Sequence, residues 1–249
     1  MKHVPKVIAH RGASGVAPEN TLAAVEQAWA ENADGLECDV RLTSDCQVVC
    51  IHDVDTERVG DRKLIVEEHT YEGLEQVDVG AFKSDAYTGE RIPLLSEWLM
   101  DIPERKRVLI ELKTGEEILT PLFEVLDASS VPLPQVVIIV FDTEMVNALK
   151  VRRPELQVYW LIDVQSNWLG RSKLKLDDVL ETAKALCADG LGLRCHSGIH
   201  REMVQQILEA DLELNIWTVD DPSDARRYAD FGVTSISSNF PRAMREAMQ

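Results

Sequence analysis

The sequence predicts a (β/α)8 barrel, the α/β fold in which eight parallel strands alternate with helices around a closed core. Three observations support this prediction. Short apolar runs alternate with helical patterns along the chain, as repeated βα units do. The length of 249 residues accommodates eight such units. The turn after the first strand lacks the GxGxxG pattern that is typical of an open, dinucleotide-binding sheet.

The expected elements follow one another from the first strand to the C-terminal helix. Strands are indicated by short runs rich in apolar and β-branched residues, and we expect them at 7–9, 35–42, 48–52, 108–112, 136–141, 157–162, 190–193, 214–219 and 235–238. Helices are indicated by apolar residues three or four positions apart, and we expect them at 21–31, 116–128, 143–152, 176–187, 201–210, 222–231 and 241–248.

Residues 54–92 interrupt this alternation. The segment is polar and fits no single βα unit, so we interpret it as an insertion after the second strand. It has too few apolar residues for a core of its own. We therefore expect residues 1–249 to form one barrel domain, with 54–92 as a small cap over the mouth.

Composition excludes several classes of protein. The net charge is −17, from 43 acidic and 26 basic residues, whereas a nucleic-acid binder normally carries a basic face. The longest apolar runs fall short of the roughly 18 residues that cross a bilayer, and the N-terminus lacks the apolar core of a signal peptide. Five cysteines without CxxC spacing favour a reducing compartment. We expect a cytoplasmic protein with a small-molecule substrate; a homo-oligomer stays open.

Two neighbouring strands carry acidic residues on one face. Side chains alternate along a strand, so Glu37, Asp39 and Arg41 share one face of the strand at 35–42, and Glu111 and Lys113 share one face at the end of the strand at 108–112. A salt-bridge ladder with Arg41 would explain the first strand by itself. Both strands together favour a site for one divalent cation, Mg²⁺ or Ca²⁺ with Mn²⁺ as a third choice, because such ions prefer oxygen ligands.

Two strands also end in histidine. His10 follows the first strand and His52 ends the strand expected at 48–52. Imidazole titrates near neutral pH, so this pair could take up and release protons in turn. Arg11 and Lys113 add two cations beside the predicted ion, and such a cluster suits a substrate that carries a phosphate.

Several motifs together resemble the glycerophosphodiester phosphodiesterase family, in its bacterial cytoplasmic form. They are IAHRGASGVAPENTLAA, GLECDVRLTSDCQVVCIHD, GERIPLLSEWL, LIELKTG and NIWTVDDPSDARRYADFGVTSISSNFP, which span nearly the whole chain. The order HRG, PENT, E-x-D, HD and E-x-K is specific, although each piece alone is weak. The resemblance implies the TIM barrel and the inserted subdomain of that family.

The resemblance also implies roles for individual residues. It assigns the metal to Glu37, Asp39 and Glu111, acid–base catalysis to His10 and His52, and substrate binding to Arg11, Lys113 and Trp217. Glu19 and Asn20 match the family's PEN motif and either contribute to the site or begin a helix. Two departures bear on specificity: Asn239 stands where many relatives have Asp, and the segment 193–197 is more polar than usual.

The implied reaction is the metal-dependent hydrolysis of a glycerophosphodiester to sn-glycerol 3-phosphate and an alcohol. The neighbouring glycerol hydroxyl would attack phosphorus, and water would then open the cyclic phosphate; either histidine can be the first base. A lysophospholipase D-type enzyme is an alternative that needs an apolar track, for which Trp160 and Trp168 are the candidates. A non-catalytic glycerophosphate-binding protein is a further alternative.

Overall fold

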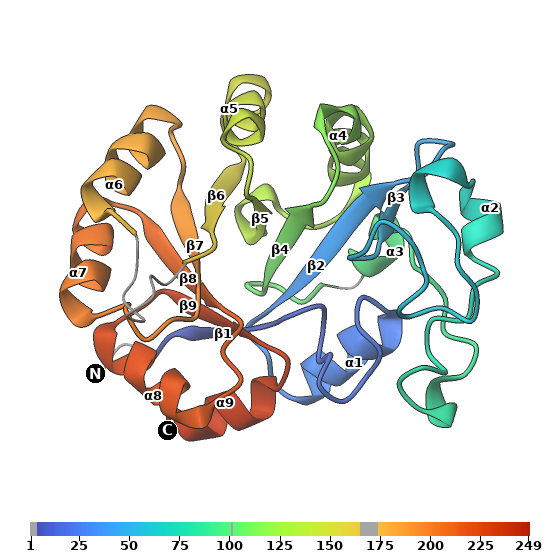
Figure 1. The fold of residues 1–249 in the computed structure, drawn as a ribbon, viewed down its shortest axis with the longest axis horizontal. Helices are drawn as coiled ribbons and strands as arrows, with labels where there is room; N and C mark the ends of the chain where they lie inside the picture. Colours follow the sequence, from blue (N-terminus) through green and yellow to red (C-terminus); the bar gives the residue numbers. More distant parts are fainter. Residues whose placement is uncertain (1–3, 101, 165–173) are drawn as a thin grey trace.

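A computed structural model describes residues 4–100, 102–164 and 174–249. It confirms the (β/α)8 barrel: eight parallel strands close a ring because β1 pairs with both β2 and β9 (Figure 1). In ring order the strands are β1 Lys6–Ala9, β2 Gly35–Leu42, β4 Arg107–Leu112, β5 Val136–Val140, β6 Gln157–Ile162, β7 Gly190–Arg194, β8 Glu213–Trp217 and β9 Ser235–Ser238.

The strand predicted at 48–52 does not belong to this ring. β3 spans Val48–Cys50 and pairs antiparallel with the end of β2. A five-residue connection after β2 permits a hairpin, whereas a parallel partner needs a crossover of a dozen residues or more. The turn is closed by a hydrogen bond of 3.0 Å from Thr43 N to Gln47 O. His52 therefore follows the end of β3 by two residues and sits on a loop, which corrects the prediction that it ends a strand.

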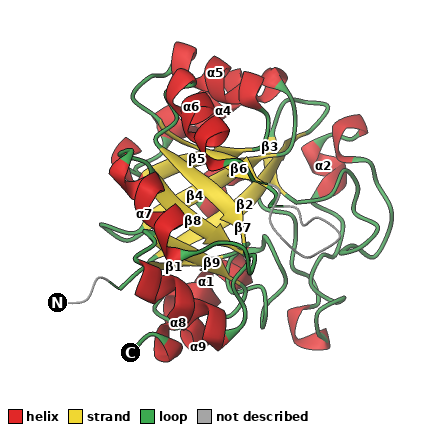
Figure 2. Ribbon diagram, turned by 60° about the vertical axis from the view of Figure 1, so that its left-hand side comes forward, coloured by secondary structure: helices red, strands yellow, loops and turns green. Residues whose placement is uncertain are grey.

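The predicted helices are confirmed, with ends that differ by a few residues, and they surround the strands (Figures 1 and 2). They are α1 Leu22–Ala30, α4 Leu119–Ala128, α5 Thr143–Arg152, α6 Leu176–Ala185, α7 Arg201–Glu209, α8 Pro222–Phe231 and α9 Pro241–Ala247. The expected start of the first helix is confirmed, because Thr21 caps α1 by accepting a hydrogen bond from Ala24 N. The helix expected from 116 begins with a 3-10 turn, Glu116–Ile118.

Apolar side chains pack in two layers. The outer faces of the strands pack against the helices, as Leu36, Cys38 and Val40 of β2 do. Inside the ring, Ile8, Leu109, Val137, Ile139, Tyr159 and Leu161 form a separate apolar cluster. At the carboxyl ends of β2 and β4 the inward faces carry polar residues instead, and the carboxyl ends of the strands are where TIM barrels place their active sites.

The inserted segment 54–92 lies beside β3 and the loop between β1 and α1. It contains the short helix α2 Tyr71–Leu74 and 3-10 turns at Val66–Glu68 and Asp85–Tyr87, and α3 Leu95–Trp98 follows it. Lys83 Nζ donates to Ser14 O at 2.7 Å, on the loop that leaves the carboxyl end of β1. Its small apolar cluster includes Val49 and Ile51 from β3 and its end. Figures 1 and 2 show the segment at one side of the barrel; its role as a cap stays a prediction.

The opposite end of the barrel holds a polar cluster. Arg107, the first residue of β4, is buried and donates to Glu213 and to Gln157, the first residues of β8 and β6, and Tyr159 OH donates to Glu213. Burial would raise the pKa of Glu213, but the hydrogen bonds from Tyr159 and Arg107 lower it below its ordinary value. The Glu213 carboxylate therefore balances the charge of a buried guanidinium.

We expect Glu213→Gln to lower the free energy of unfolding by about 1–2 kcal/mol at pH 7, because Arg107 loses its charged partner. A carboxylate whose pKa is lowered by folding stabilises the fold above its unfolded pKa, near 4.5, and this contribution disappears as pH falls through the folded pKa. Urea unfolding of the wild type and of Glu213→Gln from pH 3 to 8 should show the full difference between their free energies of unfolding above about pH 5. An equal difference at pH 3 would contradict this account. Glu116→Gln, in an exposed pair with Arg152, is the control.

Candidate active site

Three carboxylates meet at the carboxyl ends of β2 and β4. Glu37 and Asp39 occupy alternate positions on the inner face of β2, and Asp39 is the register partner of Glu111 on β4. All three are buried, and each offers an oxygen within 4.8 Å of the others. The structure thus brings together the three residues predicted to hold a metal.

Two cations face these carboxylates. Arg11 Nε lies 3.0 Å from Asp39 Oδ2, and Lys113 Nζ lies 3.2 Å from Asp39 Oδ1 and also contacts Glu111. Arg41 instead donates to two main-chain carbonyls, His52 O at 2.9 Å and Lys113 O at 3.1 Å. The alternative of a salt-bridge ladder with Arg41 is therefore wrong: its guanidinium holds the loops that follow β3 and β4.

The cations do not balance all three acids equally. Burial would raise the pKa of Asp39, but Arg11 and Lys113 lower it below its ordinary value. Burial and the neighbouring Asp39 raise the pKa of Glu37 to about 8 and that of Glu111 to about 7. No donor among the described residues reaches Glu37 Oε1, although that atom is buried. Oxygen ligands with unbalanced negative charge fit a hard divalent cation.

Two side chains in series, Asn239 and Asp220, hold His10 through its Nδ1. Its Nδ1 lies 2.8 Å from Asn239 Oδ1, and Asn239 Nδ2 donates to Asp220 Oδ2 at 2.6 Å. Because the amide oxygen accepts, Nδ1 carries the proton and Nε2 points toward the carboxylates, 4.0 Å from Glu37 Oε2. Asn239, noted from sequence as a departure that bears on specificity, thus contacts a histidine.

His52 is held in the same way. Its Nδ1 lies 2.6 Å from Asp53 Oδ1, and a carboxylate can accept but not donate, so the proton is again on Nδ1. Burial is the main cause that lowers the pKa of both histidines, and Arg11 adds to it. These causes favour the neutral form of each imidazole, whose Nε2 can accept a proton.

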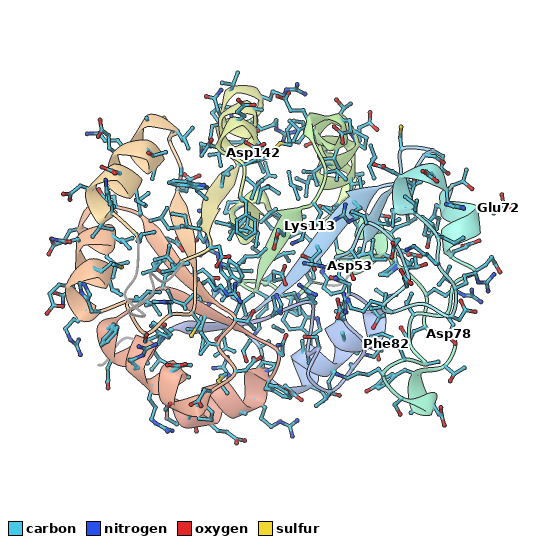
Figure 3. The ribbon with its side chains drawn as sticks, in the orientation of Figure 1. Asp53, Glu72, Asp78, Phe82, Lys113 and Asp142 are labelled. Carbon is cyan, nitrogen blue, oxygen red and sulfur yellow. The ribbon has the colours of Figure 1, made fainter. Side chains whose placement is uncertain are left out.

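These groups line a cavity of about 240 Å³. One wall is charged and contains His10, Arg11, Glu37, His52, Glu111 and Lys113. The other wall is apolar and contains Ile139, Leu161, and the edge-to-face pair Phe141 and Trp217, whose ring centroids lie 5.6 Å apart. Figure 3 shows Lys113 and Asp53 near the middle of the molecule, whereas Glu72, Asp78 and Phe82 lie out on the insertion. Two larger hollows lie outside the barrel and contain none of these groups. A third, open hollow of about 570 Å³ is lined by His52 and Lys113 together with Asp53 and Arg58.

Sequence reasoning identified only some of the residues that support this site. Asn20 binds Asp39 twice: its Nδ2 donates to Asp39 Oδ2 at 3.0 Å, and its Oδ1 accepts from Asp39 N at 3.2 Å. Glu19 accepts from Arg11 Nη1 at 2.8 Å. The PEN motif was the sequence signal for both residues. Its two interpretations, a contribution to the site and the start of a helix, are both correct, because the next residue, Thr21, caps α1. Asp53 belongs to the HD motif but was given no role, and Asp220 and Arg58 were given none either.

A TIM barrel with carboxylates, imidazoles and cations gathered at its strand ends has the architecture of a barrel hydrolase for anionic substrates. The model of the glycerophosphoryl diester phosphodiesterase family matches residues 10–243. The chain therefore belongs to this family of phosphodiesterases, as the sequence motifs predicted.

Individual relatives cover nearly the same span. The Bacillus subtilis protein YhdW, whose name places it provisionally among glycerophosphodiester phosphodiesterases, is 32% identical over 238 residues and 94% of each chain. A glycerophosphodiester phosphodiesterase of the same species is 28% identical over 94% of this chain and 83% of its own. A phosphodiesterase of Oleispira antarctica, solved in complex with the product sn-glycerol-3-phosphate, is 28% identical with a TM-score of 0.85, over 98% of this chain and 97% of that one.

Proposed function

We propose that this chain is a divalent-ion-dependent glycerophosphodiester phosphodiesterase that releases sn-glycerol 3-phosphate and an alcohol. The observation that carries the proposal is the convergence of Glu37, Asp39 and Glu111 within 4.8 Å, beside a cavity that Glu37 and Glu111 line together with His10 and His52. Family membership and the product bound to the Oleispira relative support the substrate class.

The three carboxylates would hold Mg²⁺, Ca²⁺ or Mn²⁺, and the bound ion would supply positive charge that stabilises the phosphate in the transition state. Arg11 and Lys113 would hold and orient the phosphate oxygens, because both cations line the cavity. Trp217 would pack its ring against the carbon skeleton of the substrate, since it belongs to the apolar wall of the same cavity.

The two histidines would move the protons. One Nε2 would take the proton of the neighbouring glycerol hydroxyl as its oxygen attacks phosphorus, and the other imidazole, protonated, would release its proton to the departing alcohol. A cyclic phosphate results, and water opens it with the two roles reversed. The hydrogen bonds to Asn239 and Asp53 support this proposal because they hold each ring by Nδ1 and leave Nε2 to the substrate.

The other candidate functions have less support. Trp160, proposed for an acyl-chain track, packs among the helices on the outer side of β6 and donates to Phe141 O at 3.0 Å; Trp168 lies outside the described residues. A non-catalytic binding protein would tolerate the loss of a histidine or carboxylate, yet all five are present. Among the described residues, no helix is both long and apolar enough to cross a bilayer. Cytoplasmic location and homo-oligomerisation stay predictions.

A substrate panel tests the proposed function. We expect release of glycerol 3-phosphate from glycerophosphocholine or glycerophosphoethanolamine, loss of activity with EDTA, and its return with Mg²⁺, Ca²⁺ or Mn²⁺. Lysophosphatidylcholine is the comparison substrate: faster release of choline from it would favour the lysophospholipase alternative. Full activity after exhaustive chelation would contradict the dependence on a divalent ion.

A further inference from the structure

One arginine of the inserted segment connects the two sides of the candidate active site. Arg58 donates Nη1 and Nη2 to the two carboxylate oxygens of Glu19, each at 2.7 Å, and donates Nε to Asp53 Oδ2 at 2.6 Å. A planar guanidinium that binds two carboxylates through three donors has its orientation fixed by all of them.

Each of these carboxylates binds a second partner inside the cavity. Glu19 Oε1 accepts from Arg11 Nη1 at 2.8 Å, and Asp53 Oδ1 lies 2.6 Å from His52 Nδ1. A continuous chain of hydrogen bonds thus runs from His52 through Asp53, Arg58 and Glu19 to Arg11. Its two ends are the candidate proton-transfer group and the candidate phosphate-binding group.

The main chain around Arg58 is held firmly. Thr56 is fully buried; its N donates to Leu64 O at 3.1 Å, and its Oγ1 accepts from Leu64 N at 2.9 Å. Val59, next to Arg58, is 5% exposed and packs in the apolar cluster of the insertion. The arginine therefore projects from a closed loop whose neighbours on both sides are anchored.

We propose that Arg58 is a positioning residue, through which the inserted segment sets the orientation of His52 and Arg11. The inference rests on the proposed function of those two residues and extends it to the insertion, for which only a covering role was expected. Without the guanidinium, Asp53 and Glu19 are two acids with no shared cation. Each can then rotate and carry the imidazole or Arg11 away from its position.

The expected effect of Arg58→Ala is a fall in kcat of about 10- to 100-fold, the usual cost of losing a group that orients an active-site residue. KM should change less, because Arg58 does not line the cavity of the carboxylates. In the open hollow that it shares with His52 and Lys113, its donors are occupied by Glu19 and Asp53. The melting temperature should hardly move, since the Arg58 side chain is 46% exposed and such ion pairs contribute little to stability. Arg58→Lys should recover part of the rate, because lysine keeps the positive charge but lacks the planar guanidinium that binds both carboxylates at once.

The matched control is Arg62→Ala. Arg62 lies in the same loop and is 52% exposed, and it pairs with Asp61. We expect this variant to keep the wild-type kcat. Added guanidinium should restore turnover in Arg58→Ala and leave Arg62→Ala and His52→Ala unchanged. A wild-type kcat in Arg58→Ala would overturn the inference. So would a lower kcat that added guanidinium does not restore and that a lower melting temperature of the variant explains.

A readout independent of turnover separates this inference from the proposed function. In protein labelled with ¹⁵N-histidine, the Nδ1–H of His52 should be observed in the wild type and should be lost or shifted in Arg58→Ala, but not in Arg62→Ala. An unchanged signal would overturn the positioning role even in an active enzyme. An inactive wild type with the expected change in the signal would refute the proposed function and leave the positioning role supported.

Discussion

Replacement of His10 or His52 by Ala is expected to lower turnover of a glycerophosphodiester by about 100-fold or more, the lower end of the usual effect of general acid–base catalysis. The two imidazoles line one cavity, and each is held through Nδ1, by Asn239 and by Asp53. Because the two groups act in one proton-transfer cycle, the double variant should be little slower than either single variant. Steady-state kinetics on glycerophosphocholine at saturating ion would measure all three.

The control for this experiment is His200→Ala. His200 is exposed, and its Nδ1 accepts from Met203 N at the start of α7, so this substitution should affect helix stability and not turnover. Ion affinity should be retained in His10→Ala and His52→Ala, because neither residue is a proposed ligand. Near-normal turnover in His52→Ala would return this histidine to a structural role, and Glu19 would be the next candidate proton donor.

Substitution of a carboxylate is expected to abolish binding of the divalent ion and to lower turnover by about 1000-fold, since a bound ion contributes several kcal/mol to the transition state. Glu37→Gln is the sharpest variant. Glu37 Oε2 accepts a hydrogen bond from the main-chain N of Arg11 at 2.7 Å, so the substitution leaves the ion pairs of Asp39 with Arg11 and Lys113 intact. Isothermal titration with Mg²⁺, Ca²⁺ and Mn²⁺ would measure the loss directly.

A second consequence of Glu37→Gln concerns stability. Burial and the neighbouring Asp39 raise the pKa of Glu37 to about 8 without an ion, so this group lowers the stability of the fold at neutral pH. The chelated variant should therefore melt at a higher temperature than the chelated wild type. Added Mg²⁺ should raise the melting temperature of the wild type and leave the variant unchanged. Glu213→Gln, at the opposite end of the barrel, should keep wild-type ion affinity. Undiminished binding by Glu37→Gln would refute the proposed set of ligands.

Local patterns in the sequence determined the elements and much of the proposed site. Alternation along two strands is a property of the strand itself, because successive side chains point to opposite faces. It was therefore enough to place Glu37 and Asp39 inside the barrel and to predict that Glu111 faces them. Repeated βα units likewise predicted the barrel. The direction of β3 was also implied by its short connection to β2, but the apolar run alone suggested another barrel strand.

Only the tertiary structure decided which groups hold the candidate catalytic residues. His10 and Asn239 are 229 positions apart, and Arg58 and Glu19 are 39 apart; no local periodicity relates residues at such separations. Tertiary structure also decided the partners of Arg41. The strand pattern placed it beside the acidic residues, but in the fold it donates to two main-chain carbonyls. The sequence by itself thus determined the barrel and the faces of its strands, whose causes are local backbone geometry. The hydrogen bond that orients His10, and those of Arg58 to the partners of His52 and Arg11, depend on how loops from separate parts of the chain meet at the mouth.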